Sequence, residues 1–141
     1  WCTAELSNCE EAVQDYSKAI ELSPNDAEAY FNRGWCKAEL SHCDEAVQDY
    51  SKAIELSPND ADAYNGRALC YGDELNDREK AIADLTKGIE VDPKNANLYY
   101  NRALFYQDDD KKSQALADVK KFLELEPTDQ DGLDLLKELN G

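Results

Sequence analysis

The chain has 141 residues, with 31 acidic and 15 basic side chains and a net charge of −16 at pH 7. So negative a surface repels nucleic-acid backbones and anionic membranes, and we expect neither as a partner. No apolar stretch reaches the roughly 18 residues that a membrane-spanning helix needs, so membrane insertion is not expected.

A repeat of 34 residues organises the chain. Residues 1–30 recur almost unchanged as residues 35–64, with 26 of the 30 positions identical. The prolines continue this period to the end of the chain, with spacings of 34, 35 and 34, at Pro24, Pro58, Pro93 and Pro127. A fixed period of this length is typical of an array of one supersecondary unit, and such arrays present surfaces more often than they assemble active sites.

Each unit is predicted to contain two helices. An amphipathic run precedes every proline, with apolar side chains at steps of three, four and seven. In the second unit we expect helices over residues 27–39 and 44–56, joined by a short polar connection and therefore antiparallel. Proline ends a helix, and the Asn, Asp or Thr residues after it are good N-caps for the next one. The third unit has one extra residue, which we place near residues 75–77.

The period divides the chain into five parts. These are a half repeat over 1–26, repeats over 27–60, 61–95 and 96–128, and a terminal helix over 129–139 with Leu133, Leu136 and Leu139 on one face. In the half repeat, Trp1 aligns with Trp35 in the middle of a first helix, and Cys9 aligns with the start of a second helix. Because the chain starts within a helix and contains no Met, we expect it to be the C-terminal part of a longer polypeptide.

These features resemble the tetratricopeptide repeat (TPR) family. The family's pattern of aromatic and small residues is carried in the second unit by Tyr30, Gly34, Ala46, Tyr50, Ala53 and Pro58. The resemblance covers essentially the whole chain. It implies an all-α fold, a right-handed solenoid of antiparallel helix pairs whose last helix caps the stack. It says little about function, because the same solenoid serves many partners.

The resemblance also places a partner-binding groove, since the stacked first helices of TPR arrays line a concave face. Aromatic and aliphatic side chains with an acidic rim, and no Lys or Arg, are expected there. The residues are Trp1, Glu5, Glu28, Phe31, Asn32, Trp35, Glu39, Asp62, Asn65, Leu69, Asp73, Asn97, Tyr100 and Leu104. We therefore expect a basic or amphipathic protein segment as the partner, bound as a helix or an extended strand. In the alternative interpretation the acidity only solubilises the chain, and Trp1 and Trp35 pack on neighbouring helices.

The same surface argues against one known TPR activity. The chaperone-tail-binding class holds a C-terminal carboxylate with Lys, Arg and Asn side chains from three successive first helices. Here Asn32 matches one of these positions, but the basic positions of the third first helix hold acidic residues, Asn or Gly. We do not expect this activity.

Five cysteines follow the repeat. Cys2, Cys36 and Cys70 share a position late in the first helix, whereas Cys9 and Cys43 share one at the start of the second. They are interpreted either as small buried residues or as disulfides. Pairing within units joins Cys2–Cys9 and Cys36–Cys43, and pairing between units joins Cys9–Cys36 and Cys43–Cys70. We favour the second, because the Cys36 face should point back to the preceding unit and the Cys9 face forward to the next.

The cysteines also bear on location and on metals. Disulfides imply an extracellular or periplasmic protein, whereas without them the default expectation is cytoplasmic. A zinc site is not expected, because the chain has one His, His42, and no C-x-x-C motif. No other metal or cofactor is expected either.

Arginine and aspartate also recur with the repeat. A buried Arg needs a paired carboxylate, so we expect a structural ladder between helices, with the individual pairs left open. Its members are Arg33, Arg67 and Arg102, and Asp15, Asp49, Asp84 and Asp118.

No catalytic constellation stands out, since there is no nucleophile elbow, no phosphate-binding Gly-rich loop and no pair of carboxylates in opposed environments. We therefore expect a non-enzymatic scaffold for protein–protein interaction. The alternative is a structural subunit that assembles head to tail into a filament, through its open half repeat and its terminal helix.

Overall fold

The computed structural model describes the backbone of residues 2–141 and the side chains of residues 8–141. Helices follow one another in a single row, and no strand occurs within residues 2–141. They are α1 (Cys2–Leu22), α2 (Ala27–Glu39), α3 (Cys43–Leu56), α4 (Ala61–Leu69), the π-helical turn η1 (Cys70–Glu74), α5 (Arg78–Val91), α6 (Ala96–Asp108), α7 (Lys112–Leu125) and α8 (Gln130–Asn140).

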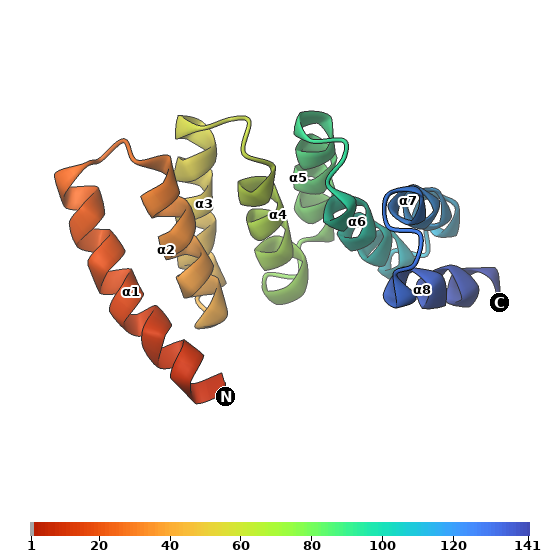
Figure 1. The fold of residues 1–141 in the computed structure, drawn as a ribbon, viewed down its shortest axis with the longest axis horizontal. Coiled ribbons are helices and arrows are strands. Elements are labelled where there is room, and N and C mark those ends of the chain that lie inside the picture. Colours follow the sequence, from red (N-terminus) through yellow and green to blue (C-terminus); the bar gives the residue numbers. More distant parts are fainter. Residues whose placement is uncertain (1) are drawn as a thin grey trace.

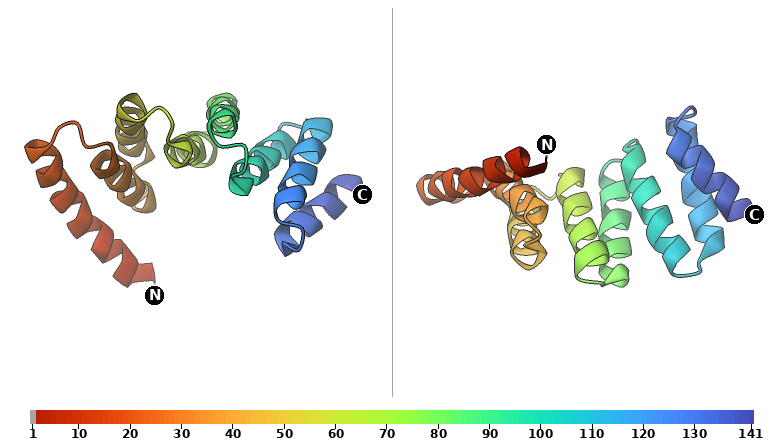
Figure 2. Two further views of the ribbon diagram at one scale, coloured as in Figure 1. Left: turned by 45° about the horizontal axis from the view of Figure 1, so that its top comes forward. Right: turned by 90° about the horizontal axis from the view of Figure 1, so that it is seen from below.

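The row turns as it advances. Each helix packs mainly on its neighbours in sequence, with α1 and α8 at opposite ends of the array (Figures 1 and 2). In Figure 1 α3 lies close to the plane of the picture, whereas α7 is seen nearly end-on. Such a progressive rotation is that of a solenoid, and the predicted all-α fold class is confirmed.

Three of the four helices that follow a proline start at a side-chain cap, whereas Asn95 before α6 makes no such hydrogen bond. Asp26 accepts the backbone N–H of Ala29 at 3.2 Å, and Asp129 accepts that of Gly132 at 2.9 Å. Asp60 caps α4 in the same way. Each of these residues satisfies donors that the first turn of a helix leaves without partners.

The turns within the repeats need a left-handed residue. Ser41, Asn76 and Asp110 have φ values of 59°, 53° and 55°, each between the first and second helix of its repeat. Asn and Asp tolerate this conformation better than most residues do. The reversal that pairs the two helices thus depends on one residue at a fixed place in each repeat.

The N-terminal half repeat differs from expectation. We expected a second helix to start at Cys9, but α1 runs unbroken from Cys2 to Leu22. In the next repeat the equivalent segment breaks at Ser41, because α3 folds back and buries its apolar face against α2. Only seven described residues precede Cys9, too few to form such a pair, and the backbone continues as helix.

The extra residue of the third unit is absorbed upstream of where we placed it. The N–H of Leu75 donates to the carbonyl of Cys70 at 3.1 Å, an i→i+5 bond that defines the π-helical turn η1 over Cys70–Glu74. A π-turn takes up one additional residue within a helix. The connection to α5 therefore keeps the geometry of the other repeats.

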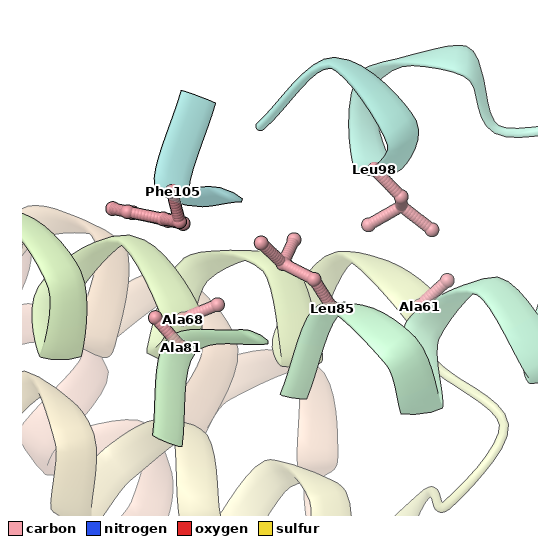
Figure 3. Packing of buried hydrophobic residues seen from close by; sticks show 6 residues of the cluster. All are labelled: Ala61, Ala68, Ala81, Leu85, Leu98 and Phe105. Atoms are coloured by element: carbon pink, nitrogen blue, oxygen red, sulfur yellow. The ribbon is translucent and has the colours of Figure 1, made fainter. Parts of the chain in front are cut away.

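The core alternates small and large side chains between helices. Figure 3 shows Leu98 and Phe105 of α6 pointing toward α4 and α5, where Leu85 lies among alanines. The six residues of this cluster are all buried: Ala61, Ala68, Ala81, Leu85, Leu98 and Phe105. Alanine lets helices approach closely, and the large residues fill the space that remains.

The terminal helix packs on the array with two of its three expected leucines. Leu139 is buried against α6 and α7 and Leu136 is half-buried, as expected, whereas Leu133 is 41% exposed. The buried residues of α8 are Gly132, Leu135 and Leu139, which advance by three and four residues and so share one helix face. Leu133 lies off that face, and Leu135, which was not expected there, lies on it.

The expected Arg–Asp ladder is present, and each rung pairs an arginine with the aspartate of its own repeat. The guanidinium of Arg33 donates two hydrogen bonds to Asp49, at 2.8 and 2.6 Å. Arg67 binds Asp84 at 2.8 and 2.7 Å, and Arg102 binds Asp118 at 2.7 Å through both nitrogens. Such bidentate pairs are the strongest protein ion pairs.

A third residue, which the sequence analysis missed, ties each rung to the preceding repeat. Arg33 also donates to the hydroxyl of Ser17 in α1 at 3.2 Å, and Ser17 itself donates to the carbonyl of Val13. The other two rungs are alike. We call each hydroxyl, arginine and aspartate set a three-helix clamp: Ser17–Arg33–Asp49, Ser51–Arg67–Asp84 and Thr86–Arg102–Asp118.

The clamps predict that the Arg67→Met substitution destabilises the array strongly. It leaves the carboxylate of Asp84, whose side chain is 12% exposed, without its ionic partner. We expect the free energy of unfolding to fall by about 3 kcal/mol, measured by urea denaturation followed by circular dichroism. Adding Asp84→Leu should recover much of this loss, because no buried charge is then left.

The matched control is Arg78→Met. Nε of Arg78 lies 3.7 Å from Oδ2 of Asp108, and the two side chains are 40% and 57% exposed. Loss of this ion pair should therefore lower the free energy of unfolding by less than about 1 kcal/mol. Equal losses in the two variants would mean that the clamps contribute no more than a surface ion pair.

Candidate functional site

A pocket of about 430 Å³ opens between α2 and α4. We call it the α2–α4 pocket. It takes side chains from four consecutive elements, α2, α3, α4 and η1, and its lining is both aromatic and acidic. The lining residues are Phe31, Trp35, Ala38, Glu39, Cys43, Tyr50, Asp62, Asn65, Gly66, Leu69, Cys70, Asp73 and Glu74.

Helical periodicity brings these residues together. In α2 the lining residues Phe31, Trp35 and Ala38 follow steps of four and three, which place them on one face of the helix. In α4, Asp62, Asn65 and Leu69 follow steps of three and four and form the opposite wall. The pocket is therefore a direct product of stacking one repeat on the next.

The apolar part of the pocket is built on Tyr50. This residue is 2% exposed, and its ring centroid lies 5.8 Å from that of Phe31 at an interplanar angle of 57°. Gly66 allows the ring to approach α4, since a Cβ atom there would lie 2.6 Å from Cζ of Tyr50. Trp35 is 51% exposed, so its indole is available at the pocket to an incoming side chain.

The polar part of the pocket is acidic. Its charged lining residues are Glu39, Asp62, Asp73 and Glu74, and no Lys or Arg is among the residues that line it. Burial raises the pKa of Asp73, and the neighbouring carboxylate of Asp108 raises it further. Both effects penalise the ionised form of Asp73, and a cation placed in the pocket would oppose them.

The pocket gathers seven of the side chains expected in the groove. These are Phe31, Trp35, Glu39, Asp62, Asn65, Leu69 and Asp73. The others in the described region lie outside it: Glu28 and Asn97 are exposed and Asn32 is half-buried, whereas Tyr100 and Leu104 pack against the cluster formed by α6, α7 and α8. Trp1 and the side chain of Glu5 lie outside the described residues.

Sequence reasoning missed the floor of the pocket. Tyr50 was assigned only to the core of a second helix, yet it reaches the pocket past Gly66. Glu74 lies on the π-helical turn, which changes the direction of its side chain from that of a regular α-helix. Periodicity alone therefore could not place it.

Of the two disulfides expected between repeats, Cys43–Cys70 is present and Cys9–Cys36 is not. A disulfide joins Cys43 of α3 to Cys70 of η1, with the Cα atoms 5.2 Å apart, at the edge of the pocket. Cys36 is thus not bonded to Cys43, as pairing within units would require. Cys9 and Cys36 are free thiols, and both are buried.

Within the described residues, no group of three or more His, Cys, Asp or Glu side chains is arranged to hold a metal ion. Over the same part of the chain, no helix combines the length and the apolar character needed to cross a bilayer.

Two buried groups predict how stability depends on alkaline pH. Burial and then the adjacent Cys9 thiol raise the pKa of Cys36 from 9.0 to about 12, and burial also raises the pKa of Tyr50. Because each pKa is higher in the folded chain, its contribution to stability is complete below the unfolded value and is lost as the pH rises toward the folded one. The urea midpoint should therefore fall between pH 9 and about pH 12.

A chain that carries both Cys36→Ala and Tyr50→Phe provides the comparison. It lacks both titrating groups and keeps most of the packing, so its midpoint should fall less steeply over the same pH range. Parallel curves for the two chains would contradict this assignment.

Comparison with known families identifies the repeat. The family described as "TPR repeat" matches residues 4–35, 39–73 and 74–110, and the one described as "Tetratricopeptide repeat" matches residues 96–129. A search of curated proteins finds no significant match.

Solved structures share the fold. The crystal structure of MamA superposes with a TM-score of 0.88 at 19% identity, over 94% of this chain and 77% of that one. The TPR domain of Arabidopsis OM64 has a TM-score of 0.77 at 28% identity, over 81% and 93% of the two chains. The first TPR of Spaghetti (RPAP3), bound to the HSP90 peptide SRMEEVD, has a TM-score of 0.77 at 22% identity, over 81% and 90%.

The family matches extend over most of the chain, and the helices, their spacing and the solenoid agree with them. The chain belongs to the tetratricopeptide repeat family.

Proposed function

We propose that the chain is a non-enzymatic interaction scaffold that binds a basic or amphipathic protein segment in the α2–α4 pocket. Membership of the TPR family supports the general role, a scaffold for protein–protein interaction. The specific proposal rests on one observation: four carboxylates and a half-exposed Trp35 line the same pocket, with no basic side chain among them.

Charge favours a cationic ligand. Asp73 already has a raised pKa in the empty pocket, because burial and Asp108 disfavour its ionised form. A Lys or Arg side chain bound beside it would relieve this repulsion and would gain partners at Glu39 and Glu74. Since the whole chain also carries a charge of −16, a basic segment is attracted before contact as well.

Apolar contacts supply the anchor. Trp35 and Phe31 lie one helical turn apart on α2, and Leu69 faces them from α4. Aromatic side chains of this kind carry much of the energy at protein interfaces. A segment with one apolar and one basic side chain on the same face can therefore satisfy both halves of the pocket.

The peptide bound by RPAP3 has a different character. Its sequence, SRMEEVD, contains three acidic residues and one basic residue. The four carboxylates of the α2–α4 pocket would repel such a peptide. The proposal thus assigns to this chain a ligand of opposite charge.

The test is binding of a fluorescein-labelled amphipathic helix composed of Lys and Leu. Trp35→Ala and Glu39→Lys should each weaken binding by roughly tenfold or more, and added salt should weaken binding to the native chain. Fluorescence anisotropy measures the dissociation constants.

The matched control is Glu21→Lys, which makes the same charge change at an exposed position outside the pocket. It should weaken binding far less than Glu39→Lys does. If the two substitutions have equal effects, the peptide is attracted only by the net charge and the pocket is not its site.

The alternative, head-to-tail assembly through α8, has less support. Aligned by their N-caps, α8 carries Leu136 where the clamp arginines stand, and Lys137 where α2 has Gly34. A Cβ atom at Gly34 would lie 3.2 Å from Cβ of Asp49 on the following helix, closer than an ordinary contact, so a lysine at this position obstructs the same packing. Light scattering across a concentration series distinguishes the two: growth in mass would favour the filament.

A further inference from the structure

The disulfide in this structure occupies a defined place in the repeat. Cys43 is the first residue of α3, and Cys70 opens η1 in the next first helix, 27 residues later. The bond therefore links the second helix of one repeat to the first helix of the next. Both side chains are buried, at 5% and 3% exposure.

A second pair of cysteines occupies the same place one repeat earlier. Cys9 lies in α1 and Cys36 in α2, and each stands 34 residues before its counterpart in the bonded pair. Both are buried, at 5% and 4% exposure. The thiol of Cys9 is, after burial, the main influence that raises the pKa of Cys36. The two thiols thus share the repeat position and the burial of the bonded pair one repeat later.

We propose that Cys9 and Cys36 form a second thiol–disulfide exchange site, which a small-molecule disulfide such as oxidised glutathione converts to an intramolecular disulfide. One sulfur, as a thiolate, attacks the reagent, forms a mixed disulfide and releases one glutathione thiol. The other sulfur then attacks the mixed disulfide and releases the second thiol. The two cysteines lose two electrons and two protons, and the reagent gains them.

Access to the sulfurs is controlled by α1. While α1 is packed on α2, burial and the adjacent Cys9 raise the pKa of Cys36 to about 12. The thiol therefore stays protonated and reacts slowly. Within the described residues, α1 packs mainly on α2 (Figure 1). Local separation of these two helices would expose both sulfurs without unfolding the rest of the array.

A disulfide between Cys9 and Cys36 would constrain the N-terminal part of the array. It would join α1 to α2 as the existing disulfide joins α3 to η1, whereas residues 71–141 contain no cysteine. Three of the elements that line the α2–α4 pocket, α2, α3 and η1, would then each carry one end of a disulfide. The inference does not depend on what the pocket binds.

The experiment maps disulfides in a Cys2→Ser chain that is fully reduced, equilibrated with oxidised glutathione, and alkylated after denaturation. Trypsin releases Cys9 in residues 1–18 and Cys36 in residues 34–37. Mass spectrometry should find these two peptides linked as the main form of Cys9. The same link should form when Cys43→Ser and Cys70→Ser are added, because the pair closes independently.

Other products would overturn the proposal. These are alkylated Cys9 and Cys36, stable glutathione adducts on either residue, or a link from residues 1–18 to the peptides of Cys43 or Cys70. A second measurement checks the native structure: the linked chain should melt several degrees higher than its reduced form. Both chains in this comparison carry Cys43→Ser and Cys70→Ser, so that the disulfide already present cannot re-form and contribute to the rise. Adding Cys36→Ser should then abolish the rise, and an equal rise in that chain would contradict the proposal.

Discussion

The clamp arginines hold the array together in a way that apolar stacking alone does not. Each guanidinium binds a carboxylate on the next helix and a hydroxyl on the preceding one, so that one side chain spans three helices. Helix pairs built on alanine and leucine can slide by a turn with little loss of burial. A bidentate ion pair cannot, because a shift would leave a buried charge unpaired. The clamps therefore fix the register in which the apolar faces meet, and the pocket forms only in that register.

The clamp does not recur at α8, the last helix described. At the α8 position Lys120 stands in the hydroxyl position and Leu136 in the arginine position, so the last helix is held by Leu135 and Leu139 instead. Gly132 lets it approach the ring of Phe122. The buried contacts of α8 are apolar and leave no buried charge, and its side-chain hydrogen bond to α6, from Gln107 to Glu138 at 3.0 Å, is exposed. Helix α8 therefore resembles a first helix of the repeat that lacks its clamp arginine.

Much of this could be predicted from the sequence, because the information recurs at a fixed period. The bounds of α2 and α3, the pairing of cysteines across repeats and seven residues of the pocket follow from helical periodicity combined with the spacing of 34. What escaped prediction depends on single contacts. Ser17 recurs with the period, but a serine carries no signal of burial. The π-turn at Cys70, and with it the place of Glu74, depends on where the backbone takes up an extra residue, and the exposure of Leu133 depends on how α8 meets α7.

One segment occurs twice with two shapes. Residues 2–9 and 36–43 share six of eight residues, yet the first lies inside α1 and the second breaks into a turn at Ser41. The reversal is thus not encoded by the segment itself; it is imposed by the helix that packs against it. When such arrays are divided into separately expressed pieces, the place of division therefore matters for the structure of the adjoining segment. In this chain the copy that lacks residues equivalent to 27–34 before it lies within a continuous helix, whereas the copy that follows those residues turns at Ser41.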